Sequence, residues 1–164
     1  MKTPIADFLA QYANSNYIRL HMPGHKGRGE LERTDITEVF GADSLFDADG
    51  IIGESERYAG EIFGAHSFYS AEGSSLSIRA MLHLACLYAR ENGKEALVLA
   101  GRNAQKSFIS AAALIGFSIE WLYSKEESYL SCNIAPKELA EKISSMENKP
   151  TAVYITSPDY LGTI

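Results

Sequence analysis

The sequence predicts an α/β fold, a three-layer sandwich with a parallel sheet, preceded by an irregular N-terminal arm. In its second half, apolar strands alternate with amphipathic helices, an order that requires right-handed crossovers between parallel strands. Residues 14–53, in contrast, lack helical periodicity and are rich in Gly, Pro and Asp. We therefore divide the chain into an N-terminal helix and arm, residues 1–53, and an incomplete α/β domain, residues 54–164.

Composition and charge restrict the class of protein. With 164 residues, 46% of them hydrophobic, the chain can bury a core without disulfides. An excess of 21 acidic over 15 basic residues argues against nucleic acid as the main partner. No apolar run approaches the ~20 residues of a membrane span, and the N-terminus lacks a signal-peptide core. Cys86 and Cys132 have neither metal-binding nor redox spacing, so we expect a cytoplasmic protein without a metal site.

The first residues are expected to form a short amphipathic helix, because Ile5, Phe8, Leu9 and Tyr12 recur at helical spacings. The irregular chain that follows still contains many apolar residues, which argues against disorder. Irregular segments of this length are usually functional loops or segments packed on a partner. We therefore interpret residues 14–53 as an arm that is held in place.

Helices and strands are expected to alternate in the rest of the chain. The strand candidates are apolar or alternating, and the helix candidates have helical periodicity. The expected helices are 54–63, 75–91, 104–115 and one that opens at Pro136; the expected strands are 66–71, 96–100, 117–123 and 151–156. Gly64 and Gly116 are natural helix ends, and Asn103 is a good N-cap. Helix 75–91 is apolar nearly all round and is therefore expected to be buried.

The loop after the last expected strand, residues 157–164, has barely begun where the sequence ends. In open parallel sheets, several such loops build the site at the carboxyl ends of the strands. A sheet of three or four strands also leaves exposed edges, which natural proteins usually cover. We therefore expect these residues to be the front part of a larger fold and to self-associate.

The segment Gly73-Ser74-Ser75 is the candidate anion site. At the N-terminus of helix 75–91, free backbone N–H groups and the helix dipole attract an anion, and two hydroxyls add donors. The alternative is a turn with a serine N-cap, which the tripeptide alone favours. The glycine patterns of dinucleotide-binding folds and of nucleotide triphosphatases do not occur, so a generic nucleotide-binding half-domain is a weak third possibility.

Other polar segments have both a functional and a structural interpretation. His21 and His25 are four residues apart, but the intervening Pro23-Gly24 removes helical geometry, so a structural loop is favoured over a metal site. Lys26 could reach an anion or a neighbouring chain, although a solvated lysine is the plainer interpretation. Residues 102–107 follow the strongest strand and would face a site, although helix capping explains them as well.

Taken together, these segments resemble the Orn/Lys/Arg decarboxylase family of pyridoxal-phosphate enzymes, which has the aspartate-aminotransferase (type I) fold. Each motif is short, but their order and spacing are specific and extend over most of the chain. They are His-Met-Pro-Gly-His-Lys-Gly at 21–27, Asp-Ile-Thr-Glu at 35–38 with Gly41, Asp43 and Leu45, Phe63-Gly64-Ala65, Gly73-Ser74-Ser75, Arg102-Asn103-x-x-Lys106-Ser107, and Thr156-Ser157-Pro158-x-Tyr160-x-Gly162. From the residues alone, Asp35 and Asp43 are expected to act in turns and helix capping.

The resemblance implies that Gly73, Ser74 and Ser75 hold the phosphate of pyridoxal phosphate. It also implies that residues 21–27 pack near an active site and a dimer interface, in a homo-oligomer that acts on a basic amino acid. Gln105 stands where the family usually has a histidine stacked on the pyridine ring. An amide can lie flat on the ring, but it lacks the imidazole that the family uses for stacking and proton transfer.

Two groups that the family's chemistry requires are not among these 164 residues. One is the Schiff-base lysine in a Ser-x-His-Lys segment, and the other is the aspartate that pairs with the pyridine nitrogen. Lys106 is not the equivalent of that lysine. We therefore expect no catalytic residue in this chain and no decarboxylation by it alone, whether it is a truncated gene product or an expressed fragment. The alternative is a non-catalytic relative of the fold that acts as a binding or dimerisation module.

Overall fold

The computed structural model describes residues 2–124 and 131–162. The chain forms two compact units, Met1–Ala71 and Glu72–Ile164. The first unit contains the arm together with the helix that ends at Gly64, and the second contains the parallel sheet. The division expected after residue 53, into an arm and an incomplete α/β domain, stays a prediction.

The first unit contains two α-helices and one short 3-10 helix. Helix α1 spans Pro4–Ala13, η1 spans Glu32–Thr34 and α2 spans Ile51–Phe63. Both η1 and α2 contact α1. The N-terminal helix and the largely irregular arm are therefore confirmed. Helix α2 ends as predicted at Gly64, which has a φ of 66°, but it begins three residues earlier than expected.

Asp43 explains the early start of α2. Its Oδ2 accepts hydrogen bonds from the backbone N–H groups of Gly50, Ile52 and Gly53 at 3.0, 2.8 and 3.4 Å, and its Oδ1 accepts one from Ser44 at 2.7 Å. Burial raises the pKa of Asp43, but these four donors lower it more, so the pKa lies below its ordinary value. A carboxylate bound to first-turn N–H groups caps a helix and complements its dipole. The predicted capping role of Asp43 is confirmed.

Residues 66–71 do not form the expected strand. The Tyr69 backbone N–H donates to Glu56 Oε1 at 2.6 Å, and the Tyr69 hydroxyl lies 2.8 Å from the Ser55 hydroxyl. Both partners belong to α2, so the polar groups of Tyr69 form hydrogen bonds with the helix and not with a neighbouring strand. The local pattern is strand-like, but among the described residues the strands form one sheet, β2-β1-β3, which does not include this segment.

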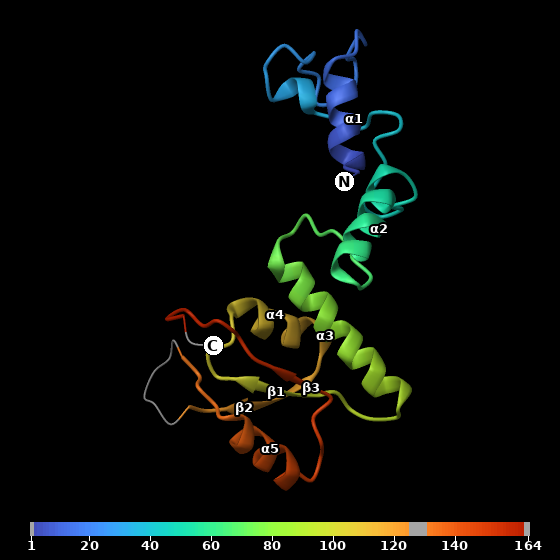
Figure 1. Ribbon diagram of the computed structural model, residues 1–164. Helices are drawn as coiled ribbons and strands as arrows, with labels where there is room; N and C mark the ends of the chain where they lie inside the picture. The colour runs from blue at the N-terminus through green and yellow to red at the C-terminus, as the bar shows by residue number, and fades with distance from the viewer. Residues whose placement is uncertain (1, 125–130, 163–164) are drawn as a thin grey trace. The chain divides into compact units, whose positions relative to one another are not determined.

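The second unit is a three-layer α/β sandwich. Its elements are α3 (Ser74–Glu91), β1 (Leu97–Gly101), α4 (Lys106–Ile115), β2 (Ser118–Leu122), α5 (Pro136–Ser145) and β3 (Ala152–Tyr154). The strand order is β2-β1-β3, and both strand pairs are parallel. Helices α3 and α4 cover one face of the sheet, and α5 covers the other (Figure 1). The predicted fold class is confirmed, although β3 is shorter than the expected strand 151–156.

The core of the second unit lies between β1 and the helices α3 and α4. Val98 and Ala100 of β1 and Phe108 of α4 are fully buried. Leu82 and Cys86 of α3 join the same cluster. Strand β1 is the central strand of the sheet and is covered on both faces, which explains why its sequence is a continuous apolar run.

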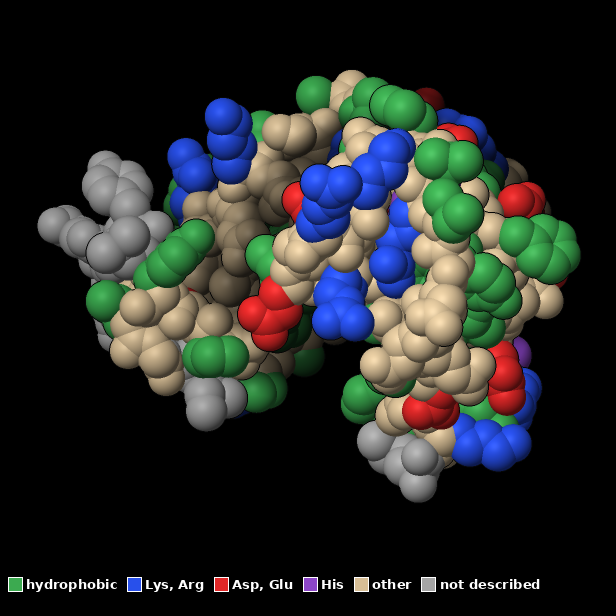
Figure 2. Space-filling model, turned by 90° about the horizontal axis from the view of Figure 1, so that it is seen from above, with side chains coloured by type: hydrophobic (Ala, Val, Ile, Leu, Met, Phe, Trp, Pro, Cys, Tyr) green, Lys and Arg blue, Asp and Glu red, His purple; other side chains and the backbone are tan. Residues whose placement is uncertain are grey.

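Helix α3 is not buried all round, which corrects the expectation. Of its residues, Leu82, Cys86 and Ala89 are buried, whereas Leu84 and Tyr88 are 66% and 64% exposed. Figure 2 shows that hydrophobic side chains reach the surface of the molecule among the charged ones. A helix packed on one face of a sheet buries only one stripe of its side chains in the core. The composition of the helix does not show whether other elements cover its remaining side chains.

The start of α4 also differs from the expectation, because the N-cap is Gln105 and not Asn103. The Ala104 N–H donates to the Gly101 carbonyl at 3.0 Å and closes a turn directly after β1. This turn includes Asn103 and delays the helix, which begins at Lys106. The predicted helix end at Gly116 is confirmed.

Candidate functional site

Gly73, Ser74 and Ser75 form the beginning of α3. Gly73 is the N-cap, with φ 65° and ψ −166°, a conformation essentially restricted to glycine. Ser74 and Ser75 are the first two helical residues, so the alternative of a serine N-cap is wrong. The first turn has neither a side-chain cap nor an acidic residue. The positive end of a helix dipole favours an anion, and the residue directly before this N-cap, Glu72, is acidic.

The surroundings of this turn leave room for a ligand. A Cβ added at Gly73 would meet no atom within 4 Å, and Ser74 and Ser75 are exposed. The nearby Arg79 guanidinium donates to the Glu72 carboxylate at 2.6 Å and to the Ser75 carbonyl at 3.3 Å. The capacity to bind an anion here thus comes from the backbone, the dipole and the two hydroxyls, while Arg79 is engaged with the chain itself.

Gln105 lies at the start of α4, shortly after the carboxyl end of β1. It has an extended backbone conformation, and its side chain makes no capping bond. In the second unit, α4 begins shortly after β1, on the side of the sheet where the parallel strands end (Figure 1). Gln105 thus lies on this side of the sheet, while Gly73, Ser74 and Ser75 begin α3, the helix that contacts α4.

Two hydroxyl groups at this edge received no individual role from the sequence. Ser107 lies in the first turn of α4, and Thr156 lies two residues beyond β3. Both hydroxyl oxygens are shielded from solvent and make no hydrogen bond among the described residues. Burial raises the pKa of Tyr154 and the nearby Thr156 hydroxyl lowers it in part, but no hydrogen bond of ordinary geometry joins the two. An unpaired buried hydroxyl costs about 1–3 kcal/mol, so both are candidate contacts for a bound polar group.

Arg102 is explained by packing. Its guanidinium lies over the Trp121 ring, 5.2 Å from the centroid, and its backbone N–H donates to the Leu122 carbonyl at 2.9 Å. Asn103, beside it, is buried. Of the polar segment 102–107, the later residues therefore remain the better candidates for ligand contact.

The two histidines of the arm bind to residues of the arm. His21 Nε2 is 3.0 Å from the Tyr12 hydroxyl, and its Nδ1 is 2.6 Å from the Met22 carbonyl oxygen. His25 Nε2 is 2.9 Å from Asp35 Oδ2. Within residues 2–124 and 131–162, no group of three or more potential ligand side chains could hold a metal ion, and no helix has the length and apolar character to cross a bilayer. Both histidines thus make their hydrogen bonds to residues of the first unit.

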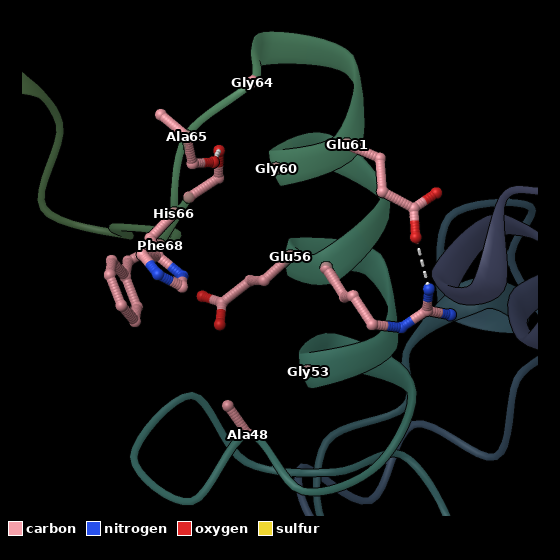
Figure 3. Close-up of a pocket in the computed structure, with 11 residues that line it drawn as sticks. Ala48, Gly53, Glu56, Gly60, Glu61, Gly64, Ala65, His66 and Phe68 are labelled. Atoms are coloured by element: carbon pink, nitrogen blue, oxygen red, sulfur yellow. Dashed lines mark hydrogen bonds and ion pairs between the residues drawn. The ribbon is translucent and has the colours of Figure 1, made fainter.

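A hollow of about 590 Å³ lies beside α2 in the first unit (Figure 3). The Glu56 and His66 side chains face one another across it, and Phe68 lies next to His66 (Figure 3). Glu56 already accepts the Tyr69 N–H, and Glu61 is paired with Arg57. The hollow contains none of the residues predicted to bind a cofactor. It is lined by Ala48, Gly53, Glu56, Arg57, Gly60, Glu61, Gly64, Ala65, His66, Ser67 and Phe68.

Comparison with known proteins decides the family. The family model described as "Orn/Lys/Arg decarboxylase, major domain" matches residues 3–164. The chain belongs to the Orn/Lys/Arg decarboxylase family. The resemblance seen in the sequence is thereby confirmed, and membership of this family implies pyridoxal phosphate in the parent enzymes.

Relatives within the Orn/Lys/Arg decarboxylase family are much longer than this chain. The arginine decarboxylase of Halalkalibacterium halodurans is 25% identical, over 98% of this chain and 34% of the relative. The uncharacterized protein YaaO of Bacillus subtilis is 28% identical, over 99% of this chain and 35% of the relative. The structure of the Escherichia coli constitutive lysine decarboxylase has the same fold, with a TM-score of 0.63 at 19% identity, over 97% of this chain and 25% of that chain. The chain thus spans about a third of these curated relatives.

Proposed function

We propose that this chain is the N-terminal portion of a pyridoxal-phosphate-dependent decarboxylase of arginine, lysine or ornithine, and that its second unit binds the cofactor phosphate. The observation that carries the proposal is the first turn of α3, which combines a glycine-only N-cap, open space and two exposed hydroxyls, while the preceding Glu72 carboxylate is paired with Arg79. These features fit a phosphate group. The free state of Cys86 and Cys132 supports a cytoplasmic location. Self-association would cover the edge strands β2 and β3.

Each residue has a distinct part in this proposal. The first-turn N–H groups of α3 and the hydroxyls of Ser74 and Ser75 bind the phosphate, and Gly73 lets it approach the backbone. Gln105 contacts the pyridine ring with an amide in place of an imidazole, and an amide has no titrating proton. Ser107 and Thr156 offer hydroxyls to other polar groups at the same edge. When bound, pyridoxal phosphate supplies the electron sink for loss of a carboxylate.

Replacing Ser74 and Ser75 together by alanine is expected to weaken cofactor binding at least about tenfold. A hydrogen bond to a charged group contributes about 1.5–3 kcal/mol, so loss of even one exceeds this factor. The measurement is an NMR titration of the α3 first-turn amides with pyridoxal phosphate, inorganic phosphate and pyridoxal. Ser77→Ala, further along α3 and also exposed, is the matched control and should bind as the wild type does. Equal shifts with pyridoxal, which has no phosphate, would contradict the proposal.

The 164-residue chain supplied with pyridoxal phosphate is expected to release no CO2 from arginine, lysine or ornithine above the background of the free cofactor. Catalysis in the family requires a lysine that forms a Schiff base with the cofactor and an aspartate that pairs with the pyridine nitrogen. The Ser-x-His-Lys segment of that lysine does not occur in this sequence, and no aspartate here is assigned to the pyridine nitrogen. Release of CO2 is measured for all three amino acids. Turnover above background would show that a residue of this chain, such as Lys106, takes the part of the missing lysine.

A non-catalytic role as a binding or dimerisation module is the second candidate, and Gln105 favours it. If this position no longer has to stack on a pyridine ring, selection no longer retains the histidine, and an amide can replace it. In this case the chain is expected to form a mixed complex with a full-length relative, such as the arginine decarboxylase of H. halodurans. Co-expression followed by size-exclusion chromatography with light scattering measures the mass of the complex. Separate elution of the two proteins would count against this role.

A further inference from the structure

His25 lies in the arm among three partners, and its side chain is 16% exposed. Its Nε2 is 2.9 Å from Asp35 Oδ2. Its Nδ1 accepts a hydrogen bond from the Gly27 backbone N–H at 3.0 Å and lies 3.9 Å from Glu32 Oε2. Because the Gly27 N–H can only donate, Nδ1 carries no proton in this arrangement, and the ring proton on Nε2 is donated to Asp35.

Asp35 accepts the same hydrogen bond from His25 Nε2 in both protonation states of the ring. Its Oδ1 accepts the Thr37 backbone N–H at 2.8 Å. The hydrogen bonds from Thr37 and then from His25 hold the pKa of Asp35 well below its usual range. Asp35 is therefore ionised wherever an imidazole changes its charge, and it accepts the Nε2 proton in both states of the ring. A change in protonation acts on Nδ1 alone.

Nδ1 has two partners within reach and can use only one of them at a time. Without a proton it accepts from Gly27, and with a proton it must donate, for which the Glu32 carboxylate is in place. Glu32 Oε2 is held on the same turn by the backbone N–H groups of Arg28 and Gly29, at 3.1 and 3.0 Å. We propose that His25 is a pH-sensitive switch: protonation of Nδ1 breaks its bond to Gly27 and forms one to Glu32.

The bond to Gly27 holds strained backbone, so its loss has a structural consequence. Lys26 has a φ of 67°, in the left-handed region that residues with a side chain rarely adopt. Gly27 follows with a φ of 65°, and a Cβ there would lie 2.6 Å from Arg19 Cδ, so the turn rests directly on Arg19. When the bond breaks, Lys26 is free to leave the left-handed region. Protonation thus changes the position of an exposed lysine on the arm.

The other charged and titratable groups around His25 offer no rival acceptor. The His21 ring meets the His25 ring edge-on, with centroids 6.0 Å apart, and both nitrogens of His21 are in hydrogen bonds, one of them with the Tyr12 hydroxyl of α1. Arg19 can only donate, and it does so to two backbone carbonyls. In the described part of the arm, Glu32 is the carboxylate that faces Nδ1.

NMR spectroscopy of the 164-residue chain tests the switch. On lowering the pH from 8 to 5, the His25 ring nitrogens and the Gly27 amide are expected to shift together. Glu32→Gln removes the charged acceptor but keeps an oxygen for the turn, and the change of the Gly27 amide over this pH range should then become smaller, because the protonated ring no longer gains an ionic partner. A Gly27 amide that does not follow the ring, or a transition unchanged in Glu32→Gln, would overturn the proposal.

His25→Asn is the matched control, because the asparagine Oδ1 can take the place of Nδ1 as acceptor for Gly27 without titrating. In this variant the Gly27 amide is expected to be independent of pH between 8 and 5. A persisting transition at Gly27 would show that another group causes it and would overturn the proposal. Should the arm of this variant unfold, visible as collapse of its amide dispersion, the comparison of wild type with Glu32→Gln decides the question alone.

Discussion

Replacing Phe108 by alanine is expected to destabilise the second unit by about 3–5 kcal/mol, as for other fully buried phenylalanines. The side chain of Phe108 is 0% exposed. Its ring centroid lies 5.7 Å from that of Phe117, 6.0 Å from that of Trp121 and 4.5 Å from that of Tyr154. These partners lie before β2, in β2 and in β3, so the cavity would open where α4 meets the sheet.

Urea denaturation followed by Trp121 fluorescence measures this loss, because Trp121 is the single tryptophan and contacts Phe108. The matched control is Ile109→Ala, the next residue of α4, whose side chain is 44% exposed. The control should cost about 1 kcal/mol or less, since a half-exposed side chain loses less burial and leaves no closed cavity. Equal losses for the two variants would show that Phe108 is not at the centre of the core.

The parts of the fold that could be predicted are those with a local physical cause. The continuous apolar run of β1 follows from burial on both faces of the sheet, and the alternation in β2 is the local period of a strand. Gly64 and Gly116 adopt left-handed conformations at helix ends, which a side chain would disfavour. Parallel pairing then follows from the order of the elements, without knowledge of any single contact.

The parts that could not be predicted depend on partners distant in the sequence. Residues 66–71 have a strand-like pattern, but Glu56 takes the Tyr69 N–H that a neighbouring strand would have used. In the candidate site, the position of Gly73 at a helix N-terminus could be predicted because a helix start is a local feature. The shielding of the Ser107 and Thr156 hydroxyls depends on packing at the sheet edge. In the sequence, Ser107 belongs to the polar segment 102–107 and Thr156 is the last residue of an expected strand, which does not single out either hydroxyl.

Gly53→Ala is expected to destabilise the first unit by about 2 kcal/mol, although alanine at an open helical position is more stable than glycine by about 1 kcal/mol. A Cβ at Gly53 would overlap the carbonyl oxygen of Ala48 and lie 2.8 Å from its carbonyl carbon. Both are backbone atoms, so no side chain can turn away. The loop before α2 must therefore lift off the helix, which also pulls the Asp43 carboxylate away from the N–H groups that it caps.

Hydrogen–deuterium exchange of peptides covering residues 40–60 measures this effect, because the first unit contains no tryptophan. Gly60→Ala is the matched control on the same helix: its Cβ would lie 2.9 Å from the Ala65 carbonyl oxygen, a smaller overlap. Protection is therefore expected to fall in the order wild type, Gly60→Ala, Gly53→Ala. If Gly53→Ala were instead protected as well as wild type, the backbone of residues 43–48 would not rest on α2. Position 53 would then accept a side chain as well as a glycine, and the early start of α2 would depend on Asp43 alone.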